Sequence, residues 1–187
     1  MSQQNPRSKD ELVLAVRKGF RPRYLFFWGH KPLPNNVIGP SCFSQWWPAR
    51  FVVDEIEYLT AEHFMMAEKA RLFEDYEVRN QILNAGSPKL AKQLGRNVRN
   101  FKDDVWQESR FQIVVRGNLE KFRQNRELRD YLLRSGNKVL VEASPVDRIW
   151  GIGLGQDDKR AKNPETWVGL NLLGFALIEV RQRLLEG

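Results

Sequence analysis

The sequence contains a single cysteine, Cys42, and only two histidines, His30 and His63. One cysteine excludes an intramolecular disulfide and any all-cysteine metal site. Two histidines leave few ligands for a zinc site, so neither a metal nor a cofactor is expected. No apolar run approaches the roughly 20 residues that a membrane-spanning helix needs. The first ten residues are polar and lack an apolar signal core. We therefore expect a soluble, cytoplasmic protein.

Aromatic residues and positive charge are abundant. The chain has 187 residues, of which 42% are hydrophobic, which suits one domain with a real core. The net charge is +7, and the segment 89–138 holds 13 Lys or Arg against 6 Asp or Glu, a surplus equal to that of the whole chain. This segment either attracts phosphates or nucleic acid, or is a solvated helical face with excess Lys and Arg.

Local signals predict an α+β fold that is mostly helical, with a small antiparallel sheet. Ser8 followed by Glu11 is a capping box that opens a short helix, and Thr60 and Ser87 are further N-caps. Gly117 is expected to break one long helical segment in two. Strands are expected at 24–28, 51–53, 56–59 and 139–141, and later helices at 61–73, 75–84, 88–95, 103–116, 118–134 and 169–185.

Two charged residues lie on the face of the helix expected over 61–73 that should be apolar. At 100° per residue, Glu62 and Lys69 fall within about 20° of each other, among Met66, Phe73 and other apolar residues. Burying such charges is costly unless they are paired or shifted in pKa. A buried ion pair is one interpretation, but their separation of about 10 Å along the helix argues against direct pairing. We favour two charges that point into a ligand cavity. His63 lies off this face, and we expect it to be structural or peripheral.

A second group of polar residues and glycines follows the strand expected at 139–141. Glu142 comes directly after this strand and Asp147 lies in the next loop, where catalytic groups are often found. Gly151 and Gly153 let the backbone approach a ligand and offer N–H groups to a phosphate, although a tight turn is the simpler interpretation. The order strand, glycine loop, helix is missing, so no Rossmann fingerprint is present.

Three further residues could contact a nucleotide-like ligand. Asn171 opens an otherwise apolar helix and could bind a ribose hydroxyl or satisfy backbone groups. Trp106 and Trp150 could stack on a base or belong to the core.

Taken in order, these groups of residues resemble the NADAR (YbiA-like) N-glycosidase family. The resemblance covers residues 24 to 185 approximately and leaves 1–20 as an N-terminal extension of a domain over 21–187. One departure is Asp54-Glu55, where a turn glycine would be usual in the hairpin. The matching segments are 42–46, 60–70, 91–96, Trp106, 121–125, 141–144, 147–153 and 167–174.

The resemblance implies an N-glycosidase that cleaves a bond between ribose C1′ and a base nitrogen. Members are associated with ADP-ribose on guanine of nucleic acid or nucleotides, or with ribosylated pyrimidine phosphate intermediates of riboflavin synthesis. The sequence shows no deaminase or reductase portion, which favours the first class. The resemblance places Phe43 and Ser44 among the substrate-binding residues, and Arg96 becomes a candidate for pyrophosphate or nucleic-acid contact. No membrane or obligate protein partner is implied.

Two mechanisms fit the catalytic candidates Glu62, Lys69, Glu142 and Asp147. In the first, Lys69 attacks C1′ and forms a Schiff base after ring opening, while Glu62 or Asp147 carries protons. In the second, Glu62 or Glu142 activates water and Lys69 only positions the substrate. Two rivals remain: a non-catalytic binder of ADP-ribose or nucleic acid, and a structural helical domain with a basic surface.

Overall fold

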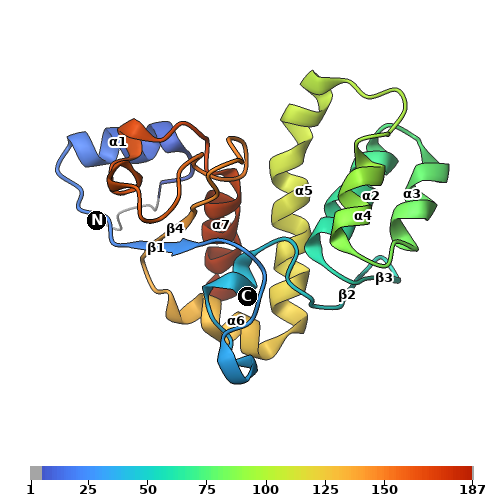
Figure 1. Cartoon of the computed structure of the whole chain (residues 1–187), viewed down its shortest axis with the longest axis horizontal. Coiled ribbons are helices and arrows are strands. Elements are labelled where there is room, and N and C mark those ends of the chain that lie inside the picture. Colours follow the sequence, from blue (N-terminus) through green and yellow to red (C-terminus); the bar gives the residue numbers. More distant parts are fainter. Residues whose placement is uncertain (1–5, 187) are drawn as a thin grey trace. The chain divides into compact units, whose positions relative to one another are not determined.

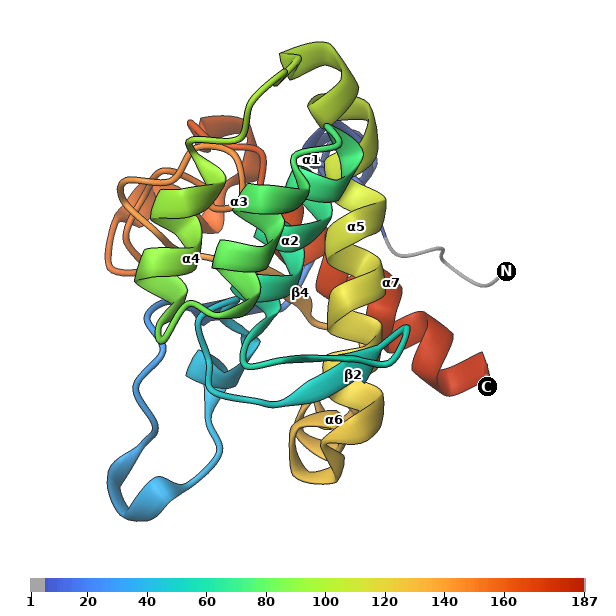
Figure 2. The same cartoon turned by 90° about the vertical axis from the view of Figure 1, so that its right-hand side faces the viewer.

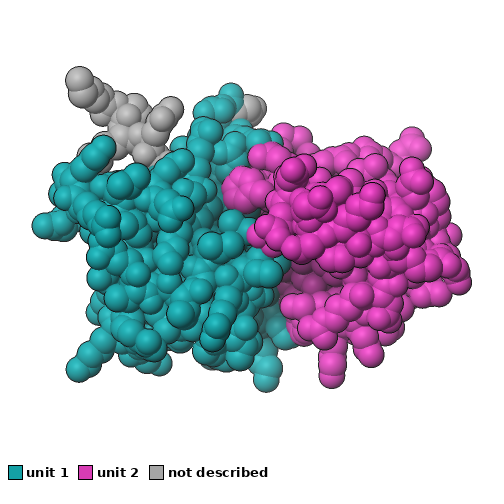
Figure 3. All heavy atoms as spheres, turned by 90° about the horizontal axis from the view of Figure 1, so that it is seen from above, with its two compact units in different colours: residues 1–44, 130–187 teal, residues 45–129 magenta. Residues whose placement is uncertain are grey.

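The computed structural model of the chain (Figure 1) describes residues 6–186, so residues 1–5 of the expected extension, and Gly187, lie outside the described residues. The chain divides into two compact units (Figure 3). Unit 1 combines residues 1–44 with residues 130–187, and unit 2 consists of residues 45–129.

A two-stranded parallel sheet and the C-terminal helix form the centre of unit 1. Strand β1 (Tyr24–Phe27) pairs with β4 (Val139–Glu142) along their whole lengths. Helix α7 (Leu172–Glu186) packs on β4. A Cβ added at Gly174 would lie 2.1 Å from the carbonyl oxygen of Leu140, so this close approach of helix to strand requires glycine.

The rest of unit 1 is one short helix and several 3-10 turns. Helix α1 (Lys9–Arg17) begins after Ser8, whose hydroxyl accepts a hydrogen bond from the Glu11 N–H, so the predicted cap is confirmed. Helix α1 packs against η4 (Pro164–Thr166). The other turns are η1 (Pro34–Asn36), η2 (Pro40–Phe43) and η3 (Lys159–Lys162).

Unit 2 is a group of helices with one hairpin. Helix α2 lies at its centre and packs on α3, α4 and α5 (Figure 2). Almost every side chain from Ala61 to Ala70 is buried, which is why α2 shows no simple apolar stripe. The bounds are β2 (Phe51–Val53), β3 (Ile56–Tyr58), α2 (Ala61–Leu72), α3 (Tyr76–Leu83), α4 (Pro88–Gly95) and α5 (Asp103–Gln124), and α6 (Arg126–Arg134) crosses the boundary between the units.

The predicted hairpin is confirmed, because β2 and β3 pair antiparallel. Asp54 and Glu55 form its turn with φ angles of 49° and 65°. A two-residue hairpin turn of this hand needs positive φ at both central positions, which glycine adopts most easily. Acidic residues therefore occupy a left-handed turn here, and Asp54 also pairs with Arg116 of α5 at 2.6 Å.

The predicted break at Gly117 is wrong, because α5 runs without interruption from Asp103 to Gln124. A Cβ on Gly117 would lie 2.4 Å from the ring of Phe64 on α2, so the glycine allows the two helices to pack closely. Asn118, expected to cap a new helix, is fully buried inside α5. Its amide donates to Gln45 Oε1 at 2.7 Å and to the Val114 carbonyl at 2.9 Å. Tertiary packing outweighs the low helix propensity of glycine here.

The mostly helical α+β class with small sheets is confirmed, and the parallel pair of β1 and β4 adds to the expected antiparallel hairpin. Helix α7 starts at Leu172 rather than at the expected Gly169, because Asn171 has a φ of 56°. No helix within residues 6–186 is long and apolar enough to cross a membrane.

Candidate functional site

Lys69 lies in the last turn of α2, among aromatic rings of unit 2. Its ammonium donates a hydrogen bond to the Gly95 carbonyl at 2.8 Å and stands 4.2 Å from the centre of the Phe101 ring. The Trp106 ring lies 5.8 Å away. The structure thus brings together two predicted site residues, Lys69 and Trp106, in a cation–π arrangement.

Burial lowers the pKa of Lys69, and the charge of Asp103 opposes this effect only in part. The side chain is half-buried, so the neutral amine is easier to form than in water. A lysine amine must be neutral to attack an electrophilic carbon, so this environment favours its use as a nucleophile.

Glu62 lies in the first turn of α2 and is only 2% exposed. A carboxylate is favourable at this end of a helix because the N-terminal N–H groups carry partial positive charge. The ammonium of Lys69 faces Gly95 and the aromatic rings rather than Glu62, so the expectation that these two residues do not pair directly is confirmed. His63 is structural, as expected: its ring nitrogens contact Thr60 Oγ1 at 2.8 Å and the Ala85 carbonyl at 2.9 Å.

Arg96 is the residue after Gly95, whose carbonyl accepts the hydrogen bond from Lys69. It forms the C-cap of α4, and its side chain is exposed. Within residues 6–186 no carboxylate pairs with it, so its guanidinium can bind an anion from solution.

The segment that follows β4 in unit 1 is held by Asn171. The side chain of Asn171 is fully buried, accepts a hydrogen bond from the Glu142 N–H at 2.9 Å and donates one to the Leu140 carbonyl at 2.9 Å. These contacts agree with the backbone-satisfying alternative for Asn171, and its contact with a ribose stays a prediction. They also fix the backbone that carries the half-buried Glu142 at the end of β4.

Asp147 organises the loop after β4. One of its carboxylate oxygens accepts hydrogen bonds from the N–H groups of Ile149 at 2.9 Å and Trp150 at 2.8 Å. The Gly153 N–H donates to the Asp147 carbonyl at 3.0 Å, and Gly153 has a φ of 69°. The contacts of Asp147 therefore form a tight turn, which was the simpler interpretation of this glycine segment.

Gly151 lies where backbone segments meet closely. A Cβ at this position would lie 2.9 Å from the Glu142 carbonyl oxygen, which accounts for the glycine without a ligand. Trp150, next to it, is half-buried. Phosphate contact by Gly151 and Gly153, and stacking on Trp150, stay predictions.

Phe43 and Ser44 lie at the end of η2 in unit 1. Phe43 is fully buried, with its ring 5.5 Å from the rings of both Phe27 and Tyr131, as a core residue would be. Ser44 is half-buried and forms the C-cap of η2. Ser44 is therefore the more accessible of the two predicted binding residues.

Phe101 was not foreseen from the sequence, although its ring is the closest aromatic contact of Lys69. It lies in the connection between α4 and α5, where no helical or strand periodicity assigns a face. Only the neighbouring Trp106 and the family segments pointed to this part of the chain.

Much of the positive charge in segment 89–138 is paired. Arg99 contacts Asp75 and Glu77, and Arg116 contacts Asp54. Several other cations, including Lys89 and Lys102, are exposed. The pairing agrees with a solvated helical face, while the exposed cations remain available to phosphates.

Known proteins show the same fold and sequence pattern. The NADAR domain profile matches residues 26–185. The chain is 42% identical over 165 residues to N-glycosidase R617 of Acanthamoeba polyphaga mimivirus, covering 86% of this chain and 95% of the viral protein. It is 35% identical over 158 residues to protein irg-1 of Caenorhabditis elegans, covering 76% and 74% of the two chains. The NMR structure of E. coli YbiA superimposes with a TM-score of 0.68 and 26% identity, covering 89% of this chain and 88% of YbiA. This chain therefore belongs to the NADAR family.

Proposed function

We propose that this N-glycosidase removes ADP-ribose from ADP-ribosylated guanine in nucleic acid or nucleotides. N-glycosidase activity rests on family membership and on relatives that carry this name. The observation that carries the proposal within the chain is Lys69, a half-buried amine with a lowered pKa beside Phe101 and Trp106. Such an amine suits attack on the C1′ carbon of a ribose.

In the proposed reaction, the nitrogen of Lys69 forms a bond to C1′ as the bond from C1′ to the guanine nitrogen breaks. The leaving base takes a proton from Glu62 or Asp147, which acts as general acid. Loss of a proton from the lysine nitrogen and opening of the ribose ring give a Schiff base. Water then hydrolyses the Schiff base, which releases ADP-ribose and restores the amine.

The competing mechanism uses the same residues differently. Glu62 or Glu142 removes a proton from water, the water oxygen attacks C1′, and Lys69 holds the ribose or a phosphate through its charge. Glu62, at 2% exposure, lies in the first turn of α2, within the same helix as Lys69.

The remaining candidates bind the substrate in this proposal. Arg96 contacts the pyrophosphate through its exposed guanidinium. Trp106 stacks on a ring of the substrate, as aromatic side chains do with nucleobases. Phe43, Ser44, Trp150, Gly151, Gly153 and Asn171 stay proposed binding positions.

The test is release of ADP-ribose from an oligonucleotide that carries ADP-ribosylated guanine. The native chain should release it, and Lys69→Met, which keeps most of the side-chain volume, should lose at least about a hundredfold in rate. Gln81→Met, at an exposed uncharged position of α3 in the same unit, is the control and should keep full activity.

Other outcomes would support the rivals. Release from ribosylated pyrimidine phosphates alone would replace the proposed substrate with the riboflavin intermediates. Binding of ADP-ribose without turnover of any N-riboside would support the binding module. Global unfolding of both Lys69→Met and Glu62→Gln would support the structural role, because removing one charge of a structural set leaves its partners unpaired.

Borohydride separates the two mechanisms. A Schiff base is reduced to a stable adduct, so mass spectrometry of the native chain should show ADP-ribose attached to Lys69 through C1′. Lys69→Arg keeps a positive charge but cannot form the Schiff base. An active Lys69→Arg variant, or a native chain with no adduct, would contradict the covalent mechanism and leave the attack by water.

A further inference from the structure

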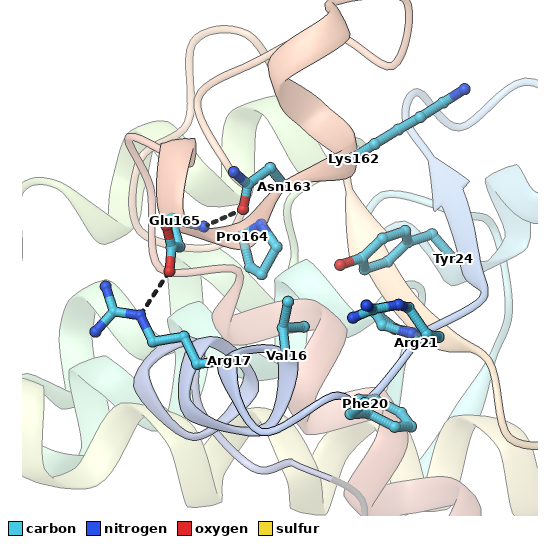
Figure 4. A pocket seen from close by; sticks show the side chains of 10 residues that line it. Val16, Arg17, Phe20, Arg21, Tyr24, Lys162, Asn163, Pro164 and Glu165 are labelled. Atoms are coloured by element: carbon cyan, nitrogen blue, oxygen red, sulfur yellow. Dashed lines mark hydrogen bonds and ion pairs between the residues drawn. The ribbon is translucent and has the colours of Figure 1, made fainter.

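We infer that unit 1 contains a second ligand site, for a nucleotide, in a pocket beside the N-terminal helix. The pocket has a volume of about 480 Å³ (Figure 4). It is lined by the end of α1, by the segment that leads to β1 and by residues 162–165. This site is distinct from the residues proposed for catalysis, and its existence does not depend on the proposed reaction.

One wall of the pocket precedes the part of the chain that the family shares. Six residues between 16 and 24 line it, whereas the NADAR profile begins at residue 26. Helix α1 is attached to the rest of unit 1 by Lys9, which donates to the Trp167 carbonyl at 2.6 Å, and by Arg17, which pairs with Glu165 at 2.6 Å. The pocket is therefore formed in part by the chain's N-terminal extension and in part by residues 162–165 of the family domain.

The charges that line the pocket favour an anion. Arg17 pairs with Glu165, the one acid among the lining residues. Arg21 and Lys162 also line the pocket, are exposed, and pair with no carboxylate within residues 6–186. Figure 4 shows Arg21 close to Tyr24, while Lys162 extends outward at the rim, where its flexible stem lets it fold over a bound ligand. Arginine binds phosphate through two parallel hydrogen bonds.

The pocket also offers apolar and aromatic surface. Val16, Phe20 and Pro164 form part of its lining, and Figure 4 shows the hydroxyl of Tyr24 turned toward Pro164. Aromatic and apolar side chains bind flat rings such as nucleobases. A pocket of a few hundred Å³ with mixed apolar and cationic walls suits a ring joined to a phosphate better than a bare inorganic anion.

The hydroxyl of Tyr24 is the polar group that a ligand would satisfy. It is buried and has no hydrogen-bond partner within residues 6–186. A buried polar group without a partner is uncommon in folded proteins and calls for an explanation. Burial raises the pKa of Tyr24 to about 12, so the hydroxyl keeps its proton at neutral pH. It can therefore donate a hydrogen bond to a ligand oxygen.

The test uses nuclear magnetic resonance of the full chain with adenosine 5′-monophosphate as the probe. Amide signals of residues 16–24 and 162–165 should shift on addition of the nucleotide, and adenosine or inorganic phosphate alone should bind more weakly. The double variant Arg21→Glu with Lys162→Glu should weaken binding by about tenfold or more. Lys89→Glu with Lys102→Glu changes the net charge equally in unit 2 and should leave binding unchanged.

Tyr24→Phe tests the hydroxyl without disturbing the ring. It removes no hydrogen bond within the described residues, so the fold should stay intact while nucleotide affinity falls several-fold. Lys69→Met should bind the nucleotide in the pocket like the native chain. Shifts absent from the pocket residues, affinity unchanged in the Arg21 and Lys162 double variant, or inorganic phosphate binding as tightly as the nucleotide would each overturn the proposal.

Discussion

At the scale of single residues, the proposed chemistry depends on how strongly Lys69 is desolvated. The two aromatic rings and the Gly95 carbonyl surround its ammonium, yet none of these groups carries a negative charge. A carbonyl and two rings stabilise an ammonium less than water does, so the neutral form gains relative to the charged form.

The pH dependence of the reaction follows from this environment. In the proposed covalent mechanism the attacking form of Lys69 is the neutral amine, whose fraction rises with pH. Because burial lowers its pKa, the rise should be complete at a lower pH than for an ordinary lysine of pKa about 10.4. We therefore expect the rate of adduct formation to increase with pH to a plateau, measured by borohydride trapping at a series of pH values.

A rate that falls with rising pH would indicate a different role for Lys69. If Lys69 acts only through its positive charge, activity should fall as pH rises through the same lowered pKa. Lys69→Arg, whose guanidinium stays charged, should then remove this fall. That pair of results would assign Lys69 to substrate positioning.

Asp75 shows how a second buried charge stabilises the fold. Its carboxylate caps α3 and accepts hydrogen bonds from the side chain and the backbone N–H of Arg99, the shortest at 2.6 Å. The bonds from Arg99 hold the pKa of Asp75 well below its usual range. A lowered folded-state pKa means that the stabilisation is present above the unfolded pKa of about 3.9 and is lost as pH falls below it.

We expect Asp75→Asn to lower Tm at pH 7, and the difference from the native chain to shrink as pH falls below about 4, where the unfolded carboxyl takes up a proton that the folded carboxylate does not. Thermal unfolding at several pH values measures this. Glu77→Gln is the matched control, since Glu77 contacts the same Arg99 at 3.0 Å but is exposed, and its Tm should hardly change. A difference that persists at low pH would show that Asp75 stabilises the chain by other means.

At the scale of elements, glycines set how closely helices approach their neighbours. Gly117 faces Phe64 of α2, and Gly95 faces Met66, with an added Cβ only 2.4 Å and 2.2 Å from the nearest atoms. Helix α5 can thus pack directly on the ring of Phe64 because Gly117 has no side chain at the point of contact. The pairing of α2 with α4 brings the Gly95 carbonyl within reach of Lys69 in the same way.

Gly117→Ala should destabilise the chain by about 1–3 kcal/mol, because the added methyl overpacks the contact with Phe64. In an ordinary exposed helix the same change would stabilise by about 1 kcal/mol, so the sign is diagnostic. Urea unfolding measures the difference. Glu108→Ala, at an exposed position of the same helix, is the control and should change stability by less than about 0.5 kcal/mol. A more stable Gly117→Ala variant would contradict the close contact of α2 and α5.

The sequence predicted elements best where their signals were local. The caps at Ser8, Thr60 and Ser87 each accept the expected backbone hydrogen bond, since a cap involves residues only three positions apart. The continuous helix through Gly117 could not be predicted, because its cause is a ring on another helix. The parallel pairing of β1 with β4 depends on segments far apart in the chain, which no local pattern reveals.

Only part of the candidate site could be predicted from the sequence, namely the residues that give a local signal. Lys69 and Glu62 could be found because charges on a buried helix violate its periodicity, and both are indeed partly or fully buried. Phe101 and the unpaired hydroxyl of Tyr24 carry no such local signal. Their importance depends on which groups surround them in three dimensions.

At the scale of the whole molecule, the net charge of +7 should act on a polynucleotide substrate. Neutralising phosphates releases counterions, so affinity for a nucleic acid falls as salt rises. For three contacted phosphates of a single strand, KM should rise about twentyfold between 50 and 200 mM salt. The same assay on a free ADP-ribosylated guanine nucleotide should show a much weaker dependence. Equal dependence for both substrates would show that the positive charge does not contribute to binding of the strand.

Unit 1 is built from the two ends of the chain, and this governs the order in which the protein can fold as it is synthesised. Strand β1 leaves the ribosome early, but its partner β4 follows only after all of residues 45–129. Unit 2 is continuous, so it can complete its fold during synthesis, as domains commonly do. Until then the aromatic strand Tyr24–Phe27 has an unpaired edge that can associate with other chains. A nascent chain of this protein therefore needs the protection of chaperones most in the interval before residue 139 is made.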